Sequence, residues 1–355
     1  MPEKLRCAVI GTGGIGLDHL ISLTTCPRAT TVAIAESNPQ RGKEASERFR
    51  IPRHYLDYRE LLEQPDIDAV VISVPNHLHA AIAIDALRSR KHVLLEKPMA
   101  TNARDAARIL AAANKTKRTL MVAQKFRFDR STQTAKLVIQ RGDLGEVYHA
   151  RCFWLRRSGI PRIGSWFTQK QLAGGGCTVD LGVHMLDLCL HLLGDFEVHS
   201  VLGQTYARFG PRGLGEYNWG KSEVDPKKPF DVEDSSVALL RLSRGRTILL
   251  ETSWAGHFNQ DGREKGIDLV GTQAGLSLYP ACLLRPGANG YEQVFLDQLK
   301  VPYPEDCVHH FVGCVLDNRR PLVAGEESLA VQRILDAIYS SAASGKEVHL
   351  ATGRS

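Results

Sequence analysis

The fold is decided by the stretch Arg6-Cys-Ala-Val-Ile-Gly-Thr-Gly-Gly-Ile-Gly16 near the start of the chain. Its first five residues are typical of a short buried strand, and a helical pattern follows from Ile15. The glycines between them match G-x-G-x-x-G: Gly11 permits a tight turn, Gly13 lacks a Cβ that would block a pyrophosphate, and Gly16 lets helix and strand pack closely. A dinucleotide, with its pyrophosphate on the helix N-terminus, is the expected ligand.

An acidic residue after the next strand favours NAD over NADP. Glu36 follows Gly16 by about 20 residues, where a carboxylate can bind both hydroxyls of the adenosine ribose and would repel a 2′-phosphate. Ser37, Asn38 and Arg41 come directly afterwards, and the Arg41 guanidinium could pair with such a phosphate. We therefore expect NAD, with NADP as the alternative.

The first 124 residues are expected to form a Rossmann domain. Short β-branched runs alternate there with longer Ala- and Leu-rich helical segments, which indicates an α/β fold with a doubly wound parallel sheet covered on both faces. The predicted strands are 6–10, 31–35, 69–73, 92–95 and 119–123. The predicted helices are 15–23, 40–49, 58–63, 77–89 and 103–113.

Residues 125–355 are expected to form a second, α+β domain for substrate binding and oligomerisation. Long strand-like runs dominate it, and Ser243-Arg-Gly245 reads as a hairpin turn, so we predict one large open, mostly antiparallel sheet. The predicted strands are 147–155, 198–209, 236–242, 246–254, 266–270 and 276–279. The predicted helices are 131–140, 182–193, 307–318 and 326–341.

Composition argues against several classes of protein. The 45 Lys and Arg against 39 Asp and Glu give a net charge of +6 without basic runs, so nucleic acid is not an expected partner. The eight cysteines lie far apart with no zinc-ribbon spacing, which predicts reduced thiols and no metal site. We read no signal peptide and no membrane span, and we expect a cytoplasmic protein.

Three further motifs identify a family. They are Val74-Pro-Asn-His-Leu-His79, Glu96-Lys-Pro98 and Gly174-Gly-Gly-Cys-Thr-Val-Asp-Leu-Gly-Val-His-Met-Leu-Asp187. Together with the glycine fingerprint, they resemble the glucose/fructose oxidoreductase and inositol dehydrogenase family, Gfo/Idh/MocA, over nearly the whole chain. The resemblance implies an NAD(P)-dependent dehydrogenase that acts on a secondary hydroxyl of a sugar, sugar derivative or cyclitol.

The resemblance assigns catalysis to Lys97, Asp180 and His184. Oxidising CH–OH to C=O requires a base for the hydroxyl proton and a cation facing the developing alkoxide, and these residue types suit that chemistry. We expect His184 to accept the proton, Lys97 to polarise the oxygen or relay the proton, and Asp180 to orient substrate or Lys97. The division between His184 and Lys97 stays open. A metal site from Asp180, His184 and Asp187 is a weak alternative, because no further ligand stands at a supporting spacing.

The resemblance also implies the cofactor contacts. Beside the glycine turn with Gly14 and Ile15, we expect contacts near the nicotinamide from Ser73, Pro75, Asn76, His79, Glu96, Lys97 and Gln124. The Lys97–Pro98 peptide bond is expected to be cis, as in relatives that hold the lysine inward.

The segment 154–167 is the predicted substrate loop, because it combines aromatic rings with Arg156, Arg157 and Arg162. Sugars stack on aromatic rings and accept hydrogen bonds from arginine, although each of these residues could instead fill the core. His257 and His310 are weaker candidates. The expected substrate contacts are Lys97, Arg156, Arg162, Trp166, Asp180 and His184.

Two alternatives remain at this level. Three arginines would also suit a phosphorylated or nucleotide-linked sugar, such as UDP-N-acetylglucosamine. A dinucleotide-dependent regulator without turnover is less favoured, because Lys97, Asp180 and His184 are all retained. The large open sheet also suggests a homodimer or homotetramer assembled through it.

Overall fold

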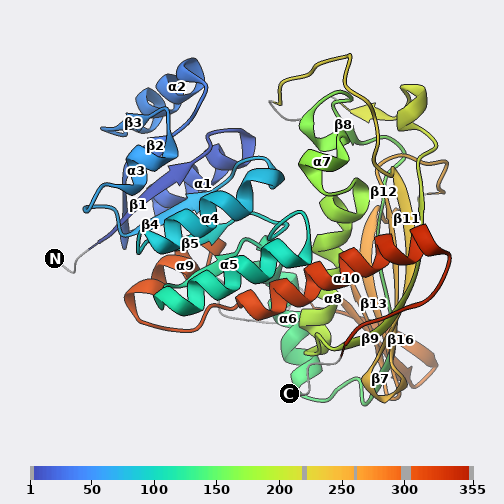
Figure 1. Cartoon of the computed structure of the whole chain (residues 1–355). Helices are drawn as coiled ribbons and strands as arrows, with labels where there is room; N and C mark the ends of the chain where they lie inside the picture. The colour runs from blue at the N-terminus through green and yellow to red at the C-terminus, as the bar shows by residue number, and fades with distance from the viewer. Residues whose placement is uncertain (1–3, 218–221, 260–261, 297–304, 352–355) are drawn as a thin grey trace.

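The computed structural model describes residues 4–217, 222–259, 262–296 and 305–351, which form two domains (Figure 1). In the first domain six parallel strands lie in the order β3-β2-β1-β4-β5-β6, which confirms the predicted doubly wound sheet. Its strands are β1 (Leu5–Ile10), β2 (Ala29–Ala35), β3 (His54–Tyr55), β4 (Ala69–Ile72), β5 (His92–Leu95) and β6 (Leu120–Val122). Its helices are α1 (Gly14–Thr25), α2 (Pro39–Phe49), α3 (Tyr58–Leu62), α4 (His79–Arg88) and α5 (Ala103–Thr116).

The strand order of this sheet sets the place for a ligand. The strand order reverses between the neighbouring strands β1 and β4. The strands β2 and β3 lie on the β1 side, and β5 and β6 lie on the β4 side. In open parallel sheets of this kind, ligands bind outside the carboxyl ends of the strands at the point where the order reverses. The loops after β1, β2, β4 and β5 therefore meet at one edge.

The second domain is a nine-stranded sheet in the order β16-β15-β14-β13-β7-β12-β11-β9-β17. Among the described strands, only the pair β7 and β12 is parallel in this sheet, so the prediction of a large, mostly antiparallel sheet is confirmed. The nine strands are β7 (Val147–Leu155), β9 (Val198–Tyr206), β11 (Ser235–Leu242), β12 (Thr247–Ser253), β13 (Lys265–Gly271), β14 (Gly275–Leu278), β15 (Cys282–Gly287), β16 (Gly290–Phe295) and β17 (Val348–His349). The short strands β8 (Ile160–Pro161) and β10 (Glu216–Tyr217) pair with each other in a separate two-stranded sheet. The helices in the second half of the chain are α6 (Arg130–Gln140), α7 (Lys170–Ala173), α8 (Val183–Leu193), α9 (Cys307–Leu316) and α10 (Gly325–Ser344).

The two closing helices differ in which sheet they cover. Figure 1 shows α10 crossing from beside α5 to the large sheet, and it contacts α5 and β6 on one side and α8 and β9 on the other. By contrast, α9 packs on α1 and β5, and Phe311 of α9 is fully buried in the core of the first domain. The end of the chain therefore fastens the two domains to each other.

The stretch from Lys170 to Leu193 is apolar and long enough to resemble a membrane span, but 89% of its most apolar window is buried inside the protein. The segment contains α7, a π-helical turn over Thr178–Gly182, and α8. The sequence predicted a helix from residue 182, whereas the helical path already begins before Asp180, because the π turn continues into α8. Its burial is that of a core helix, which is the ordinary reason for such a composition.

Arg127 is a buried residue that links the helices α8 and α10. Its side chain has no exposed surface, and it donates to both carboxylate oxygens of Asp187 on α8 at 2.8 and 2.7 Å. A third nitrogen donates to the Leu322 carbonyl at 3.0 Å and pairs with Glu327 on α10. One guanidinium thus fixes α8 and α10 relative to the segment that leaves the first domain.

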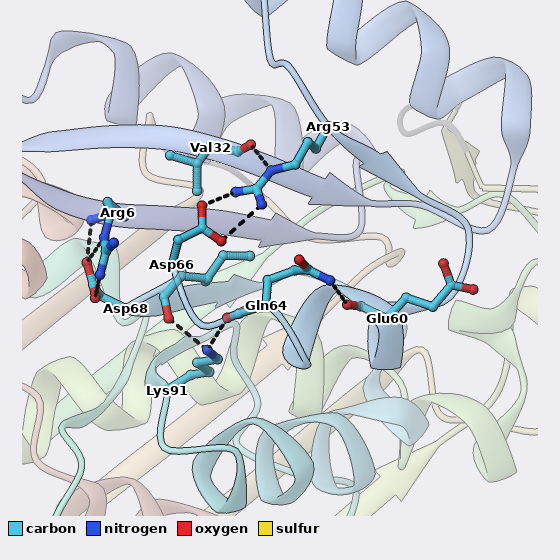
Figure 2. A network of polar contacts seen from close by, with 9 residues as sticks. Arg6, Val32, Arg53, Glu60, Gln64, Asp66, Asp68 and Lys91 are labelled. Carbon is cyan, nitrogen blue, oxygen red and sulfur yellow. Dashed lines mark hydrogen bonds and ion pairs between the residues drawn. The ribbon is translucent and has the colours of Figure 1, made fainter.

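Polar contacts fasten the opposite edge of the parallel sheet (Figure 2). The buried Lys91 ammonium donates to the carbonyls of Gln64 and Ile67 at 2.6 and 2.8 Å, and Arg53 pairs with Asp66 in the same loop. Arg6 on β1 also holds Asp68 with its backbone and its guanidinium. This loop enters β4 from its amino end, so the contacts fix the strand whose other end faces the ligand edge.

We expect Arg127→Met to lower the free energy of unfolding by about 3–5 kcal/mol, because it leaves the buried Asp187 carboxylate without its partner. Urea unfolding followed by circular dichroism measures this. The control is Arg28→Met, which breaks the solvent-exposed Arg28–Asp317 pair and should leave the midpoint near that of the parent. Equal midpoints for the two variants would contradict the assigned role.

Candidate active site

A cavity of about 1610 Å³ lies between the two domains at the carboxyl edge of the parallel sheet. Its walls include the turn after β1, the ends of β2, β4 and β5, the start of α9, and the segment from Trp154 to α8. Such a volume exceeds that of a site for one drug-sized ligand, which is roughly 300–1,000 Å³. It therefore has room for a dinucleotide and a second small molecule.

The glycine turn has the shape that a pyrophosphate requires. Gly11 has φ +91°, and a Cβ there would lie 2.5 Å from the Ser73 carbonyl oxygen. A Cβ on Gly16 would lie 2.1 Å from the Gly11 oxygen, whereas Cβ atoms on Gly13 and Gly14 would meet no described atom within 4 Å. Gly13 and Gly14 line the cavity where α1 begins, so the free N–H groups of the first helical turn can face an anion.

Glu36 lies buried at the end of β2 and borders the same cavity. One carboxylate oxygen accepts from the backbone and hydroxyl of Thr12 at 2.8 and 3.0 Å, and the other accepts from the Asn38 backbone at 3.0 Å and from Arg41 at 2.7 Å. Burial alone would raise the pKa of Glu36, but these hydrogen bonds outweigh it and lower the pKa to about 2. The carboxylate is therefore ionised and pairs with the Arg41 guanidinium. Both its negative charge and this pairing oppose the binding of a 2′-phosphate at this position.

The expected nicotinamide contacts mostly gather at the ends of β4 and β5. Ser73, Pro75, Asn76, His79 and Glu96 all line the cavity. The Asn76 amide donates to the Ala173 carbonyl at 2.8 Å and so ties this edge to α7 of the second domain.

The Lys97–Pro98 peptide bond is cis, as the resemblance implied. The two ring nitrogens of the buried His79 lie 2.8 Å from the Pro98 carbonyl oxygen and 2.9 Å from the Val74 carbonyl oxygen. His79 therefore holds the two turns after β4 and β5 together beneath Lys97.

Lys97 and Asp180 meet across the boundary between the domains. The Lys97 ammonium, at the end of β5, donates to Asp180 Oδ1 and to the Asp180 carbonyl, each at 3.0 Å. The other carboxylate oxygen, Oδ2, accepts from the indole N–H of Trp254 at 2.9 Å. Trp254 is fully buried directly after β12, so Asp180 is fixed from both sides.

His184 lies one turn further along and also lines the cavity. Its ring packs edge-on against Phe126 at 5.0 Å, and its Nδ1 is buried with no hydrogen-bond partner among the described residues. Burial, followed by the charges of Lys97, Lys125, Lys265 and Arg156, lowers the pKa of His184 well below its ordinary value. The imidazole is therefore neutral at pH 7.

The predicted substrate loop is only partly brought to the cavity. Arg156 and Trp166 line it. The Glu264 carboxylate accepts hydrogen bonds from Arg156 at 3.0 Å and from the indole N–H of Trp154 at 2.9 Å. Arg157 is exposed and donates to the Phe258 carbonyl. Arg162 is not part of the cavity wall.

Several other candidates do not line the cavity. His257 packs on Phe209, and His310 lies beside Glu305 and accepts from the Leu322 backbone. Asn38 caps α2, and Gly16 packs on Gly11. The residues expected at the cofactor or substrate that do not line the cavity are Gly16, Asn38, Gln124 and Arg162.

The sequence did not reveal two polar partners of the site, Trp254 and His19. Trp254 follows an ordinary strand, and no spacing connects it to Asp180 in sequence. His19 on α1 contacts Glu96 at 2.8 Å, and its only signal was its position three residues after Gly16 in the fingerprint helix. Over the described ranges, no three His, Cys, Asp or Glu residues are placed to hold a metal ion, and Asp187 is engaged by Arg127 instead.

Comparisons with known proteins agree with this geometry. Residues 5–124 match the model of an oxidoreductase family with an NAD-binding Rossmann fold, and residues 132–277 match the Gfo/Idh/MocA C-terminal domain. The chain is 29% identical to D-glucoside 3-dehydrogenase of Escherichia coli (strain K12), with 98% of each chain covered. It is 30% identical to levoglucosan dehydrogenase of Pseudarthrobacter phenanthrenivorans, covering 72% of this chain and 69% of that one. A solved levoglucosan dehydrogenase in complex with NADH and levoglucosan superposes with a TM-score of 0.83 at 25% identity, over 98% of this chain and 99% of that chain.

We expect Trp254→Phe to lower kcat about 5- to 100-fold, because it leaves Asp180 Oδ2 buried without its donor, a cost of roughly 1–3 kcal/mol. The variant keeps most of the aromatic volume, and its melting temperature reports any loss of packing. Steady-state kinetics at saturating cofactor measures the effect. A kcat equal to that of the parent would show that the indole N–H does not matter to Asp180.

Proposed function

This chain belongs to the Gfo/Idh/MocA family of oxidoreductases, and from that premise we propose that it transfers a hydride between NAD and a secondary hydroxyl of a sugar, sugar derivative or cyclitol. The observation that carries the proposal is the contact of Lys97 with Asp180 beside His184, in the same cavity as the glycine turn. A regulator without turnover would have no need of this arrangement.

The cofactor contacts follow from the chain itself. Gly11, Gly13 and Gly14 leave room for the pyrophosphate at the start of α1, and Glu36 binds the adenosine ribose. When bound, NAD supplies the acceptor for the hydride that leaves the carbinol carbon.

The remaining proton is handled by protein groups. Lys97 donates a hydrogen bond to the substrate oxygen and stabilises the negative charge that develops there. The neutral His184 ring is free to accept the hydroxyl proton as C–H and O–H bonds break and C=O forms. Burial and the surrounding cations then disfavour the imidazolium, so the proton passes on to water. Asp180 keeps the Lys97 ammonium aimed at the oxygen.

We favour a substrate without a phosphate or nucleotide group. Arg156 reaches the cavity, but its charge is paired with Glu264, and the Glu264 carboxylate lines the same wall. Arg157 and Arg162 contribute nothing to that wall. The wall there instead combines Trp154, Trp166 and paired charges, which suits the C–H faces and hydroxyls of a neutral sugar.

The test is a panel of free sugars, glucosides and cyclitols followed at the NADH absorbance, with NAD and NADP compared. We expect at least one neutral substrate to be oxidised with NAD, and Lys97→Met to lower its kcat about 10²- to 10⁴-fold. The matched control is Lys115→Met, an exposed lysine on α5 outside the cavity. If Lys97→Met turns over as fast as the parent on the best substrate, the assigned site is wrong.

We also propose a homodimer or homotetramer built through the large sheet, acting in the cytoplasm. Leu202, Leu239 and Leu249 lie opposite one another on β9, β11 and β12, and Leu202 and Leu239 are 51% and 41% exposed. An exposed apolar row across neighbouring strands is typical of an interface. The eight cysteines are free and buried, as reduced thiols would be in the cytoplasm.

We expect Leu239→Lys to convert the oligomer to a smaller species, because the new ammonium would be buried in the interface. Size-exclusion chromatography with light scattering measures the mass. The control Leu137→Lys, on the exposed side of α6, should keep the mass of the parent. A monomeric parent, or an unchanged mass for Leu239→Lys, would refute assembly through this face.

A further inference from the structure

A buried polar contact links the cofactor-binding helix to the strand end that carries Lys97. His19 Nε2 lies 2.8 Å from Glu96 Oε1, and the two side chains are only 10% and 14% exposed. His19 projects from α1, one turn after the glycine fingerprint, while Glu96 directly follows β5. Both residues line the main cavity, but none of the steps described above uses His19.

Two different groups hold the two carboxylate oxygens of Glu96, since His19 contacts Oε1. Glu96 Oε2 accepts from the Lys97 backbone N–H at 3.1 Å, so the carboxylate spans the distance between His19 and Lys97. Burial raises the pKa of Glu96, but the hydrogen bond and charge of His19, together with Lys97, outweigh it and lower the pKa. Glu96 is therefore ionised although it is enclosed.

The strand order of the parallel sheet indicates which part of the cofactor faces Glu96. The pyrophosphate lies at the start of α1 and the adenosine ribose lies toward Glu36 on β2. The nicotinamide half must then extend to the other side, over the ends of β4 and β5, where Glu96 lines the wall. The oxidised nicotinamide ring carries a positive charge and the reduced ring is neutral, so an ionised carboxylate here favours the oxidised form.

We propose that His19 is a positioning residue that holds Glu96 as an oriented carboxylate, and that this contact sets the preference of the site for oxidised over reduced cofactor. The proposal rests on the proposed function only in that the cofactor is NAD. It assigns His19 no contact with substrate and no part in the proton transfer.

The test compares dissociation constants of NAD⁺ and NADH, measured by fluorescence in the full-length protein between pH 6 and 9. In His19→Leu the pKa of Glu96 rises, so its charge is lost at low pH and regained as pH increases. We expect the ratio of the two constants to move against NAD⁺ by about tenfold at pH 6, which corresponds to about 1.4 kcal/mol less stabilisation of the oxidised ring. The ratio should approach that of the parent at pH 9.

Three further variants make the result decisive. Glu96→Gln should lose the preference at every pH, and His19→Gln, which keeps an N–H donor, should retain part of it. His309→Leu is the matched control, because His309 contacts the Ser22 carbonyl of α1 at 3.0 Å but does not line the cavity. It should leave the ratio unchanged.

An equal weakening of NAD⁺ and NADH in His19→Leu, or an unchanged ratio at pH 6, would overturn the proposal. Because these constants are measured without substrate, failure of the sugar panel would leave this test intact. Conversely, a normal ratio in His19→Leu alongside an active panel would refute only the role of His19.

Discussion

The contact between the Lys97 ammonium and Asp180 is the constraint on which the site depends, because each domain contributes one of the two partners. In the proposed reaction, the Lys97 cation after a Rossmann strand acts only if the second domain presents a substrate to it. Three neighbours limit the freedom of this pair: His79 holds the turn behind Lys97, Trp254 holds the far oxygen of Asp180, and Arg127 anchors the helix that follows. Buried polar side chains therefore gather around this cleft because they fix the two partners of the pair.

The charges around the cleft divide it into regions of opposite character. Ionised Glu36 and Glu96 lie at the two ends of the path expected for the cofactor, and each has its pKa lowered by donors that overcome burial. Around His184 the balance is reversed, since burial and then the charges of nearby lysines and Arg156 lower the pKa and keep the imidazole neutral. In the proposed complex, carboxylates therefore face the ribose and the pyridine ring, whereas cations face the oxygen that becomes anionic. This distribution matches the charge changes of hydride transfer from an alcohol.

Much of the fold could be predicted because the relevant signals are local. The strand-turn-helix at Gly11 to Gly16, the alternation up to residue 124 and the turn at Ser243 to Gly245 are all short-range patterns. The β15–β16 hairpin was missed, because Pro286, Gly287 and Gly290 resemble an irregular loop until neighbouring strands supply the pairing. The π turn at Asp180 was also missed, since no residue type specifies an extra residue per turn.

The sequence by itself determined the doubly wound domain and the dinucleotide turn, because glycine geometry and hydrophobic periodicity act over a few residues. Its motifs indicated Lys97, Asp180 and His184 as candidates only through their resemblance to a family. Only the tertiary structure decided which polar groups share a cavity. It brought Trp254 to Asp180 and His19 to Glu96, and it left Arg162 outside the cavity. The physical reason is that such contacts depend on how helices and sheets pack over long sequence separations, where burial and hydrogen bonding, rather than local propensity, select the partner.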